Sequence, residues 1–169
     1  MNDHTMPSPD YLGSPHPKLV LYLPHRPNGL EPLLEHPSAG ALVAANSNHW
    51  RKIVTLLAKI ASPHADDWRR FRDESLFQQT ALCFAPKLVK GTPIDASSWH
   101  WIGGRENLQR FTSLHHQAEP LTNGADVFLD RGKRLLLTPY PDYRQLSNRL
   151  VSDIRSALSD CGFYPEPKG

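Results

Sequence analysis

The sequence predicts an α/β protein of three layers, in which a mainly parallel central sheet of about four strands is flanked by helices. Short apolar runs rich in strand-forming residues alternate along the chain with stretches whose apolar residues recur every three or four positions. This order is typical of parallel strands joined by helical crossovers. The runs are also continuously apolar, which predicts strands covered on both faces.

Length and composition indicate one domain. The chain has 169 residues, of which 39% are hydrophobic and 21% are charged. Residues 1–17 are rich in Pro, Ser, Asp and Gly and offer little to bury, so we expect a flexible N-terminal arm there. Residues 18–169 should form a single α/β domain. The net charge of +2 does not by itself predict a nucleic-acid or membrane partner.

Several classes of protein are excluded by simple patterns. The longest apolar run, residues 19–23, is far shorter than the roughly 18 residues that cross a bilayer. The first ten residues lack the basic and apolar regions of a secretion signal, so we expect a cytoplasmic protein with no membrane partner. The two cysteines lie far apart, and the histidines lack the spacing of a zinc-binding helix. We therefore expect no metal and no cofactor.

The first elements of the fold are a strand and a helix. Residues 18–23 are a continuous apolar run closed by Pro24, which predicts a buried parallel strand. Residues 24–40 contain Pro and Gly and predict a loop. Apolar residues at helical spacing then predict a helix over residues 50–61, and Pro63 prevents its continuation.

The middle of the chain repeats this order. A second helix is predicted over residues 66–77, where acidic residues at the start suit the helix dipole. Residues 80–84 predict another buried strand, and residues 85–98 predict a loop. Residues 99–102 predict a third strand, which ends at a pair of glycines.

The last part of the chain predicts two helices and a hairpin. Residues 105–116 are compatible with a helix, and residues 126–138 predict a hairpin in which 135–138 is the clearer strand. Asp142 begins an Asp-x-x-Gln capping pattern before a strongly periodic apolar stretch, and Gly162 is placed to end that helix.

Ligands of parallel sheets bind beyond the carboxyl ends of the strands, so the residues that follow each strand are the candidates. His25, Arg26 and Asn28 follow the first strand. Histidine could act as an acid or base near neutral pH, arginine could hold a phosphate or carboxylate, and asparagine could fix a water or a base edge. Pro-Asn-Gly is also ordinary turn chemistry, which is the structural alternative.

Gly103, Gly104 and Arg105 follow the third predicted strand. Two glycines would let backbone N–H groups approach an anion at the start of a helix, and the arginine would add positive charge. Such a pair also serves a tight turn for steric reasons alone, and the sequence contains neither a P-loop nor a dinucleotide-binding glycine motif.

Tyr140 and Arg144 follow the last predicted strand, in a segment that two prolines stiffen. They could stack on a ligand or pair with it. Arg144 is equally compatible with a solvated helix surface. For Asp142, capping of the following helix is sufficient to explain the residue.

The four tryptophans are large enough to stack on bases, but their positions favour the core. Trp50 and Trp68 fall on the apolar stripes of the two predicted helices. Trp99 and Trp101 share one face of the third predicted strand, and His100 lies on the other.

The order of elements and three local strings resemble the uracil-DNA glycosylase superfamily, particularly its mismatch-specific branch. The strings are Pro27-Asn28-Gly29, Asn48-His49-Trp50 and Thr138-Pro139-Tyr140-Pro141-Asp142. The resemblance covers roughly residues 18–160 and implies a parallel four-stranded sheet between helices. Asn28 and Pro141 match the family's two motifs. Tyr140 stands where the family has His, and Asp142 stands where it has Ser.

The resemblance implies a site for a nucleobase or nucleotide at the carboxyl ends of the strands, and hydrolysis of an N-glycosidic bond on a flipped base. Asn28 or His25 would then be catalytic by positioning the water. Tyr140 would stack on the base, and the ligand-binding set would also contain Arg26, Gly103, Gly104, Arg105 and Arg144.

Nucleic acid or a nucleotide is the partner that this function implies, and the sequence leaves protein partners unknown. A patch of cations could supply the phosphate contacts, drawn from Arg105, Arg110, Arg131, Lys133, Arg134 and Arg144. Two alternatives stay open. One is a non-catalytic protein-interaction module built from the Pro-rich loops and the strand with two tryptophans. The other is a hydrolase of another small phosphorylated compound.

Overall fold

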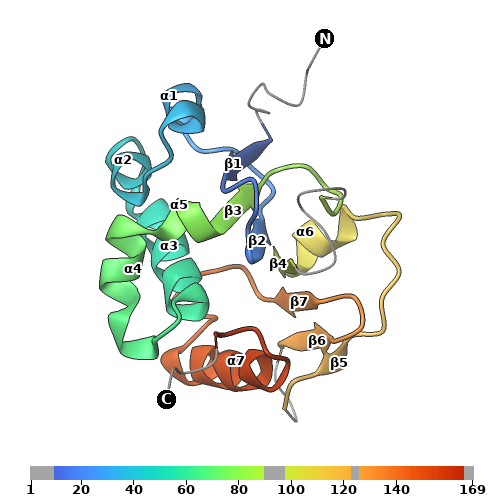
Figure 1. The fold of residues 1–169 in the computed structure, drawn as a ribbon. Coiled ribbons are helices and arrows are strands. Elements are labelled where there is room, and N and C mark those ends of the chain that lie inside the picture. The colour runs from blue at the N-terminus through green and yellow to red at the C-terminus, as the bar shows by residue number, and fades with distance from the viewer. Residues whose placement is uncertain (1–9, 90–97, 123–125, 166–169) are drawn as a thin grey trace.

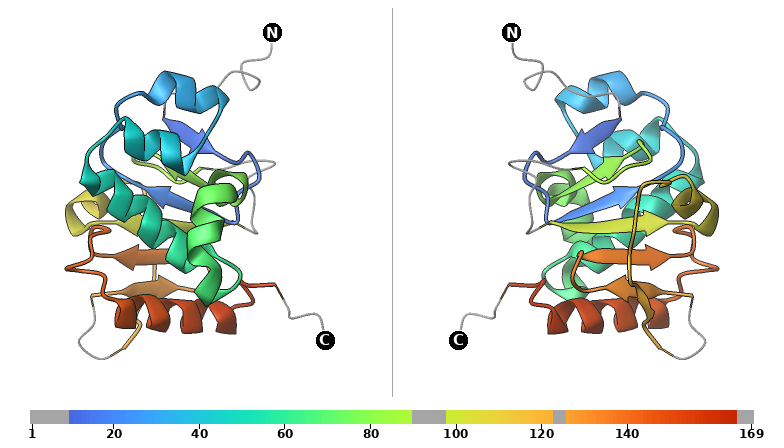
Figure 2. Two further views of the ribbon diagram at one scale, coloured as in Figure 1. Left: turned by 90° about the vertical axis from the view of Figure 1, so that its left-hand side faces the viewer. Right: turned by 90° about the vertical axis from the view of Figure 1, so that its right-hand side faces the viewer.

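The structure is a computed structural model that describes residues 10–89, 98–122 and 126–165. It confirms the α/β class. In the described residues one sheet contains seven strands in the order β1-β3-β2-β4-β7-β6-β5 (Figure 2). The strands are β1 (Tyr11–Gly13), β2 (Leu19–Tyr22), β3 (Thr80–Cys83), β4 (Trp99–Gly103), β5 (Glu119–Pro120), β6 (Phe128–Asp130) and β7 (Leu135–Thr138).

The sheet is mixed and wider than the sequence predicts. The predicted strands are β2, β3, β4 and β7, and they run parallel in the centre. Antiparallel strands extend both edges: β1 pairs with β3, and the β5–β6 pair continues from β7. The prediction of about four mainly parallel strands is therefore wrong in its extent, because β1 and β5 contain only three and two residues and give no periodic pattern. The hairpin predicted over residues 126–138 is confirmed by the antiparallel pairing of β6 with β7.

One of the edge strands comes from the segment expected to be a flexible arm. Tyr11–Gly13 forms β1, and Leu12 is fully buried against the core. Gly13 is required by close packing, because a Cβ there would lie 2.5 Å from the carbonyl oxygen of Thr80. The expected arm over residues 1–17 is thus part of the sheet at these positions, while residues 1–9 lie outside the described ranges.

Helices cover the two faces of the sheet unequally (Figure 1). Most of them pack on one face, and the short α6 with its neighbouring loops lies on the other. The flanking layer expected on that second face is therefore mostly loop. The helices are α1 (Leu30–Glu35), α2 (Ala39–Ala44), α3 (Asn48–Ala61), α4 (Trp68–Glu74), α5 (Leu76–Gln79), α6 (Arg105–Gln109) and α7 (Asn148–Asp160), with a 3-10 turn at Ala65–Asp67.

Alternation along β4 separates the two cores, as the sequence predicts. Trp99 and Trp101 are buried among the helices of the larger core. His100 points to the opposite face, where its ring meets Tyr22 of β2. The two tryptophans are thus unavailable for a protein-binding surface, and the largest exposed apolar side chain of the described residues is Tyr143.

Helix boundaries differ from the predictions at several places. The helix predicted over 50–61 is confirmed as α3, and Gly162 follows α7 with a positive φ of 76°, as a helix stop requires. The expected helix over 66–77 is interrupted at Ser75, and the one over 105–116 ends at Gln109. Residues 24–40, expected to be a loop, include all of α1 and the start of α2.

Asp142 does not cap the closing helix. The N-cap of α7 is Ser147, whose hydroxyl accepts from the N–H of Leu150. Asp142 caps a turn instead, because its carboxylate accepts from the N–H of Arg144 at 2.9 Å and pairs with Lys52 of α3 at 3.6 Å. The backbone and side-chain contacts with Arg144 and Lys52 hold the pKa of Asp142 below its ordinary value.

Gly103 allows the segment after β7 to pack on β4. A Cβ at this position would lie 2.8 Å from Cδ of Pro141, which is itself buried. We expect Gly103→Ala to lower the free energy of unfolding by about 1 to 3 kcal/mol, because the rigid proline ring has to move. Urea denaturation measures this change.

Gly40→Ala is the matched control, since the nearest atom to its new Cβ is Ser38 Oγ at 3.7 Å. Position 40 lies inside α2, so alanine there should be neutral or stabilising. A loss of stability of equal size in both variants would contradict a steric role for Gly103.

Candidate functional site

The carboxyl ends of the parallel strands meet at one edge of the sheet. The four parallel strands lie side by side in the order β3, β2, β4, β7. β2, the first of them along the chain, therefore has β3 on one side and β4 on the other. Connections leave β2 and β4 in opposite directions, and ligands of such sheets bind in the crevice at this reversal. The segments that begin at Pro24 and Gly104 therefore flank the expected position of a site.

Tyr140 connects two histidines at this edge. Its hydroxyl oxygen lies 2.9 Å from Nε2 of His49 and 3.1 Å from Nε2 of His25. The three side chains come from different elements: His25 follows β2, His49 is in the first turn of α3, and Tyr140 follows β7. We call them the His–Tyr–His group. A single hydroxyl proton serves both contacts, so one imidazole accepts from Tyr140 and the other donates to it.

The rings of the His–Tyr–His group are nearly parallel and rest on Trp50. Their planes lie within 27° of one another. Trp50, which is buried, meets both imidazoles edge-on at 82–83°. Trp50 therefore occupies the core position that the sequence predicts, and it also fixes the orientation of the two histidines.

The environment of the group sets its protonation near neutral pH. Partial burial beside its neighbours, and secondarily the charge of His49, lower the pKa of His25. Burial raises the pKa of the Tyr140 hydroxyl above its ordinary value. At pH 7 His25 is therefore neutral and able to accept a proton, and Tyr140 retains the proton that it can donate.

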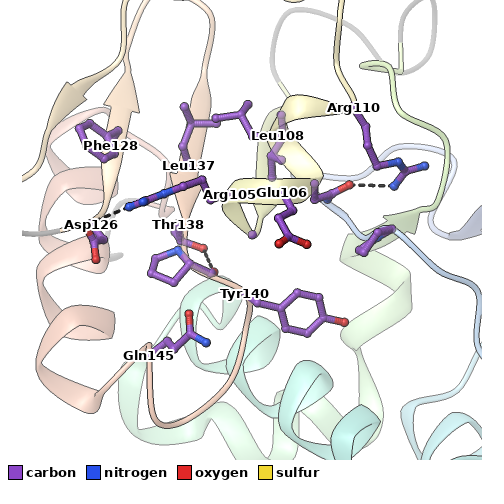
Figure 3. A pocket seen from close by; sticks show the side chains of 15 residues that line it. Arg105, Glu106, Leu108, Arg110, Asp126, Phe128, Leu137, Thr138, Tyr140 and Gln145 are labelled. Carbon is purple, nitrogen blue, oxygen red and sulfur yellow. Dashed lines mark hydrogen bonds and ion pairs between the residues drawn. The ribbon is translucent and has the colours of Figure 1, made fainter.

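A cavity of about 900 Å³ opens beside Tyr140. This volume is at the upper end of the usual range for small-molecule sites. Its apolar wall combines Ile102 and Leu137 of the sheet with Leu108 of α6 and Phe128 of β6, and Tyr140 closes one end (Figure 3). The polar side chains of the lining are Arg105, Glu106, Asn107, Arg110, Asp126, Thr138 and Gln145.

The charges of the cavity balance. Arg105 pairs with Asp126 at 3.7 Å, and both side chains are largely exposed. Arg110 donates to the side-chain oxygen of Asn107 at 2.8 Å. Glu106 makes no hydrogen bond or ion pair with any described residue, and its carboxylate points toward Tyr140 (Figure 3). Two arginines thus face two carboxylates, and Glu106 is the one that no arginine holds.

Asn107 ties the strand ends to α6. Its side-chain N–H groups donate to the carbonyl oxygens of Tyr22 at 2.9 Å and Gly103 at 3.2 Å, and its oxygen accepts from Arg110. The side chain is buried. One amide therefore joins the ends of β2 and β4 across the crevice.

The loop after β2 brings only His25 to the group. Arg26 turns to the surface and forms an ion pair with Asp10. Asn28 is exposed and held through its backbone, which donates to and accepts from the side-chain amide of Asn46 at 2.7 and 3.0 Å. Neither Arg26 nor Asn28 lines the cavity. The structure thus favours the turn interpretation for Asn28.

The predicted anion cradle has a structural explanation in this fold. The N–H of Gly104 donates to the carbonyl of Thr138 at 2.9 Å, and its φ of 102° suits glycine. A Cβ at Gly104 would touch the ring of Tyr140 at 3.4 Å. Arg105 lines the cavity, whereas Arg144 is exposed and outside the lining.

The six cations proposed as a phosphate patch are not gathered on one surface. Arg105 follows the carboxyl end of β4, and Arg110 lies just beyond α6. Arg131, Lys133 and Arg134 precede β7, whose parallel alignment with β4 places them at the opposite end of the strands. The expectation of a single patch is therefore wrong, because the hairpin turn carries half of its members away.

His49 and Glu106 were missed as candidates for different reasons. His49 stands in the Asn48-His49-Trp50 string, where its position at the start of a helix gives no sign that this end reaches the strand edge. Glu106 looks like an ordinary acidic residue in the first turn of a helix. A search for titratable residues at every helix start that follows a strand would have found Glu106.

None of the helices in the described part of the chain has the length and hydropathy that crossing a bilayer requires. Within residues 10–89, 98–122 and 126–165, no three His, Cys, Asp or Glu side chains gather closely enough to hold a metal ion.

Comparison with known proteins gives one result. The model of a family described as a family of unknown function (DUF6942) matches residues 10–159. No curated protein and no solved structure matches the chain with significance. The match begins just before β1 and ends within the last turn of α7, so it includes both the sheet and the His–Tyr–His group. The chain therefore belongs to the DUF6942 family of unknown function.

Proposed function

We propose that the chain binds a nucleobase or nucleoside unit in the cavity and hydrolyses its N-glycosidic bond at the His–Tyr–His group. One observation carries this proposal: Tyr140 belongs both to the cavity lining and to the hydrogen-bonded group. A ligand in the cavity would thus contact the side chain that can move a proton. The resemblance to the uracil-DNA glycosylase superfamily points to the same chemistry.

The charge balance of the cavity supports a neutral ligand. Arg105 and Arg110 are offset by Asp126 and Glu106, so little net positive charge attracts a phosphate. The N–H of Gly104 is already donated to Thr138. These contacts favour a base or nucleoside over a small phosphorylated compound. The apolar wall suits the faces of a planar base.

The proposed reaction balances as follows. A water oxygen forms a bond to the anomeric carbon, and the bond from that carbon to the base nitrogen breaks with its electron pair going to the nitrogen. The proton of the water passes to neutral His25, and Tyr140 donates a proton to the departing base. The imidazolium of His25 then returns a proton to Tyr140, whose hydroxyl oxygen lies 3.1 Å from its Nε2, so both groups regain their starting states. In this scheme His25 has the catalytic role that the sequence interpretation offered to Asn28 or His25. His49, 2.9 Å from the Tyr140 hydroxyl, positions that hydroxyl.

Release of free base tests the proposal. Nucleosides, and single- and double-stranded oligonucleotides that contain uracil or hypoxanthine, are incubated with the protein, and the free base is measured by chromatography. We expect the wild-type protein to release base. Tyr140→Phe should lower the rate about 100-fold, because general acid catalysis contributes roughly 10²–10⁴-fold and the ring is retained.

Tyr143→Phe is the matched control, because Tyr143 lies in the same segment, is exposed and is outside the cavity lining. Its rate should equal that of the wild type. If the wild-type protein binds bases without releasing any, the hydrolytic half of the proposal is lost. If it neither binds nor releases a base or nucleoside, the whole proposal is lost.

A further inference from the structure

The cavity contains a feature that the proposed reaction does not use. Glu106 extends from α6 into the cavity and points toward Tyr140, as Figure 3 shows. The neighbouring arginines are directed elsewhere: Arg105 pairs with Asp126, and Arg110 donates to Asn107 and to the carbonyl of Phe84. Glu106 therefore presents two acceptor oxygens to whatever occupies the cavity.

A carboxylate accepts hydrogen bonds and donates none when it is ionised. A ligand edge that faces Glu106 must therefore offer N–H donors, and an edge of carbonyl oxygens is repelled. Among the common bases, guanine alone presents two neighbouring donors on its Watson–Crick edge, N1–H and the N2 amino group, which match the two oxygens of one carboxylate. Adenine and cytosine present one amino donor beside an acceptor. Uracil presents one N–H between two carbonyls.

We infer that the cavity selects guanine, as the base or its nucleoside, by pairing the N1–H and N2 amino donors with the carboxylate of Glu106. This inference rests on the proposed function, in that it names the base that the same cavity takes. The apolar wall of Ile102, Leu108 and Leu137 suits the face of a base, and the charges of the whole lining, Glu106 included, sum to zero. The uracil preference implied by the family resemblance is not expected.

Calorimetric titration of the full-length protein with nucleosides tests this inference. Guanosine and inosine are compared first, because inosine keeps N1–H and lacks the N2 amino group. We expect guanosine to bind at least about 10-fold more tightly than inosine, because inosine loses one charge-assisted hydrogen bond to the carboxylate, and uridine to bind most weakly. This comparison needs no variant and does not depend on catalysis.

Glu106→Gln should weaken guanosine binding at least about 10-fold and reduce the difference between guanosine and inosine. Glu31→Gln is the matched control, because it removes the same charge from the first turn of another short helix, α1, whose residues do not line the cavity. It should leave both affinities unchanged.

The outcomes separate the two proposals. Equal binding of guanosine and inosine, a preference for uridine, or an unchanged guanosine affinity in Glu106→Gln would overturn the role of Glu106 and leave the binding of bases standing. Failure of the wild-type protein to bind any nucleoside or free base would overturn the proposed function and this inference with it.

Discussion

Replacing Asn107 with leucine is expected to lower the free energy of unfolding by roughly 2–6 kcal/mol, because each buried acceptor left without a donor costs about 1–3 kcal/mol. The side-chain amide of Asn107 serves the carbonyls of Tyr22 and Gly103, and leucine has nearly the same size without the polar atoms. Arg110 also loses the oxygen to which it donates. The strand ends that flank the site would thus lose the group that joins them.

Urea denaturation measures this loss, and Gln109→Leu is its matched control. Gln109 is the last residue of the same helix and is exposed, so its change to leucine should stay within about 0.5 kcal/mol. A cost below 1 kcal/mol for Asn107→Leu would show that water replaces the amide at both carbonyls. The crevice between β2 and β4 would then not depend on Asn107.

The protein is expected to lose about 3 kcal/mol of stability between pH 7 and pH 4 through His100 alone. Burial lowers the pKa of His100 to about 4 in the folded state. In the unfolded chain histidine titrates near pH 6.5, and each pKa unit corresponds to about 1.36 kcal/mol. Below pH 6.5 the unfolded chain binds a proton that the folded protein does not bind, so stability falls as the pH falls. The contribution is fully present above about pH 6.5.

The hydrogen bonds of His100 explain why the neutral form is retained. The buried Tyr22 hydroxyl accepts from the N–H of Val89 at 2.9 Å, and Nδ1 of His100, 2.7 Å away, is the acceptor that the described residues offer to its proton. His100 therefore carries its proton on Nε2. A second proton, on Nδ1, would break the hydrogen bond from the Tyr22 hydroxyl. It would also place a positive charge in a buried position.

Unfolding free energies measured at several pH values for the wild type and His100→Gln test this expectation. The glutamine variant should be less stable at pH 7 and should lose about 3 kcal/mol less on acidification, since it has no titrating ring. His36→Gln, at an exposed position after α1, is the matched control and should keep the wild-type slope. A His100 ring that titrates near pH 6.5 by NMR would contradict the expectation.

The central strands and α3 could be predicted because their signals are local. β2, β3, β4 and β7 are buried along their whole length, so their sequences are mostly apolar, with His100 as the polar residue inside β4. The buried face of α3 repeats at helical spacing in the same way.

The helix boundaries and the edge strands of the sheet could not be predicted. The edge strands bury too few side chains, and more than one residue is suited to cap the closing helix. β1 buries one side chain, and that is too little to produce a pattern. Asp142 and Ser147 are both good capping residues, and the sequence favours Asp142 because Gln145 completes a capping pattern with it. Docking of Pro141 against Gly103 and the ion pair with Lys52 hold Asp142 in a turn, which delays the helix to Ser147.

The sequence by itself determined the α/β class, the four central strands and the edge at which His25 and Tyr140 would lie, because these follow from local apolar patterns and from parallel topology. Only the tertiary structure decided which side chains meet there. His25 and Tyr140 are 115 residues apart, and His49 and Tyr140 are 91 apart. No local pattern encodes contacts over such separations. They depend on how α3 and α6 pack over the strand ends, which brings in His49 and Glu106 and leaves Asn28 and Arg144 outside.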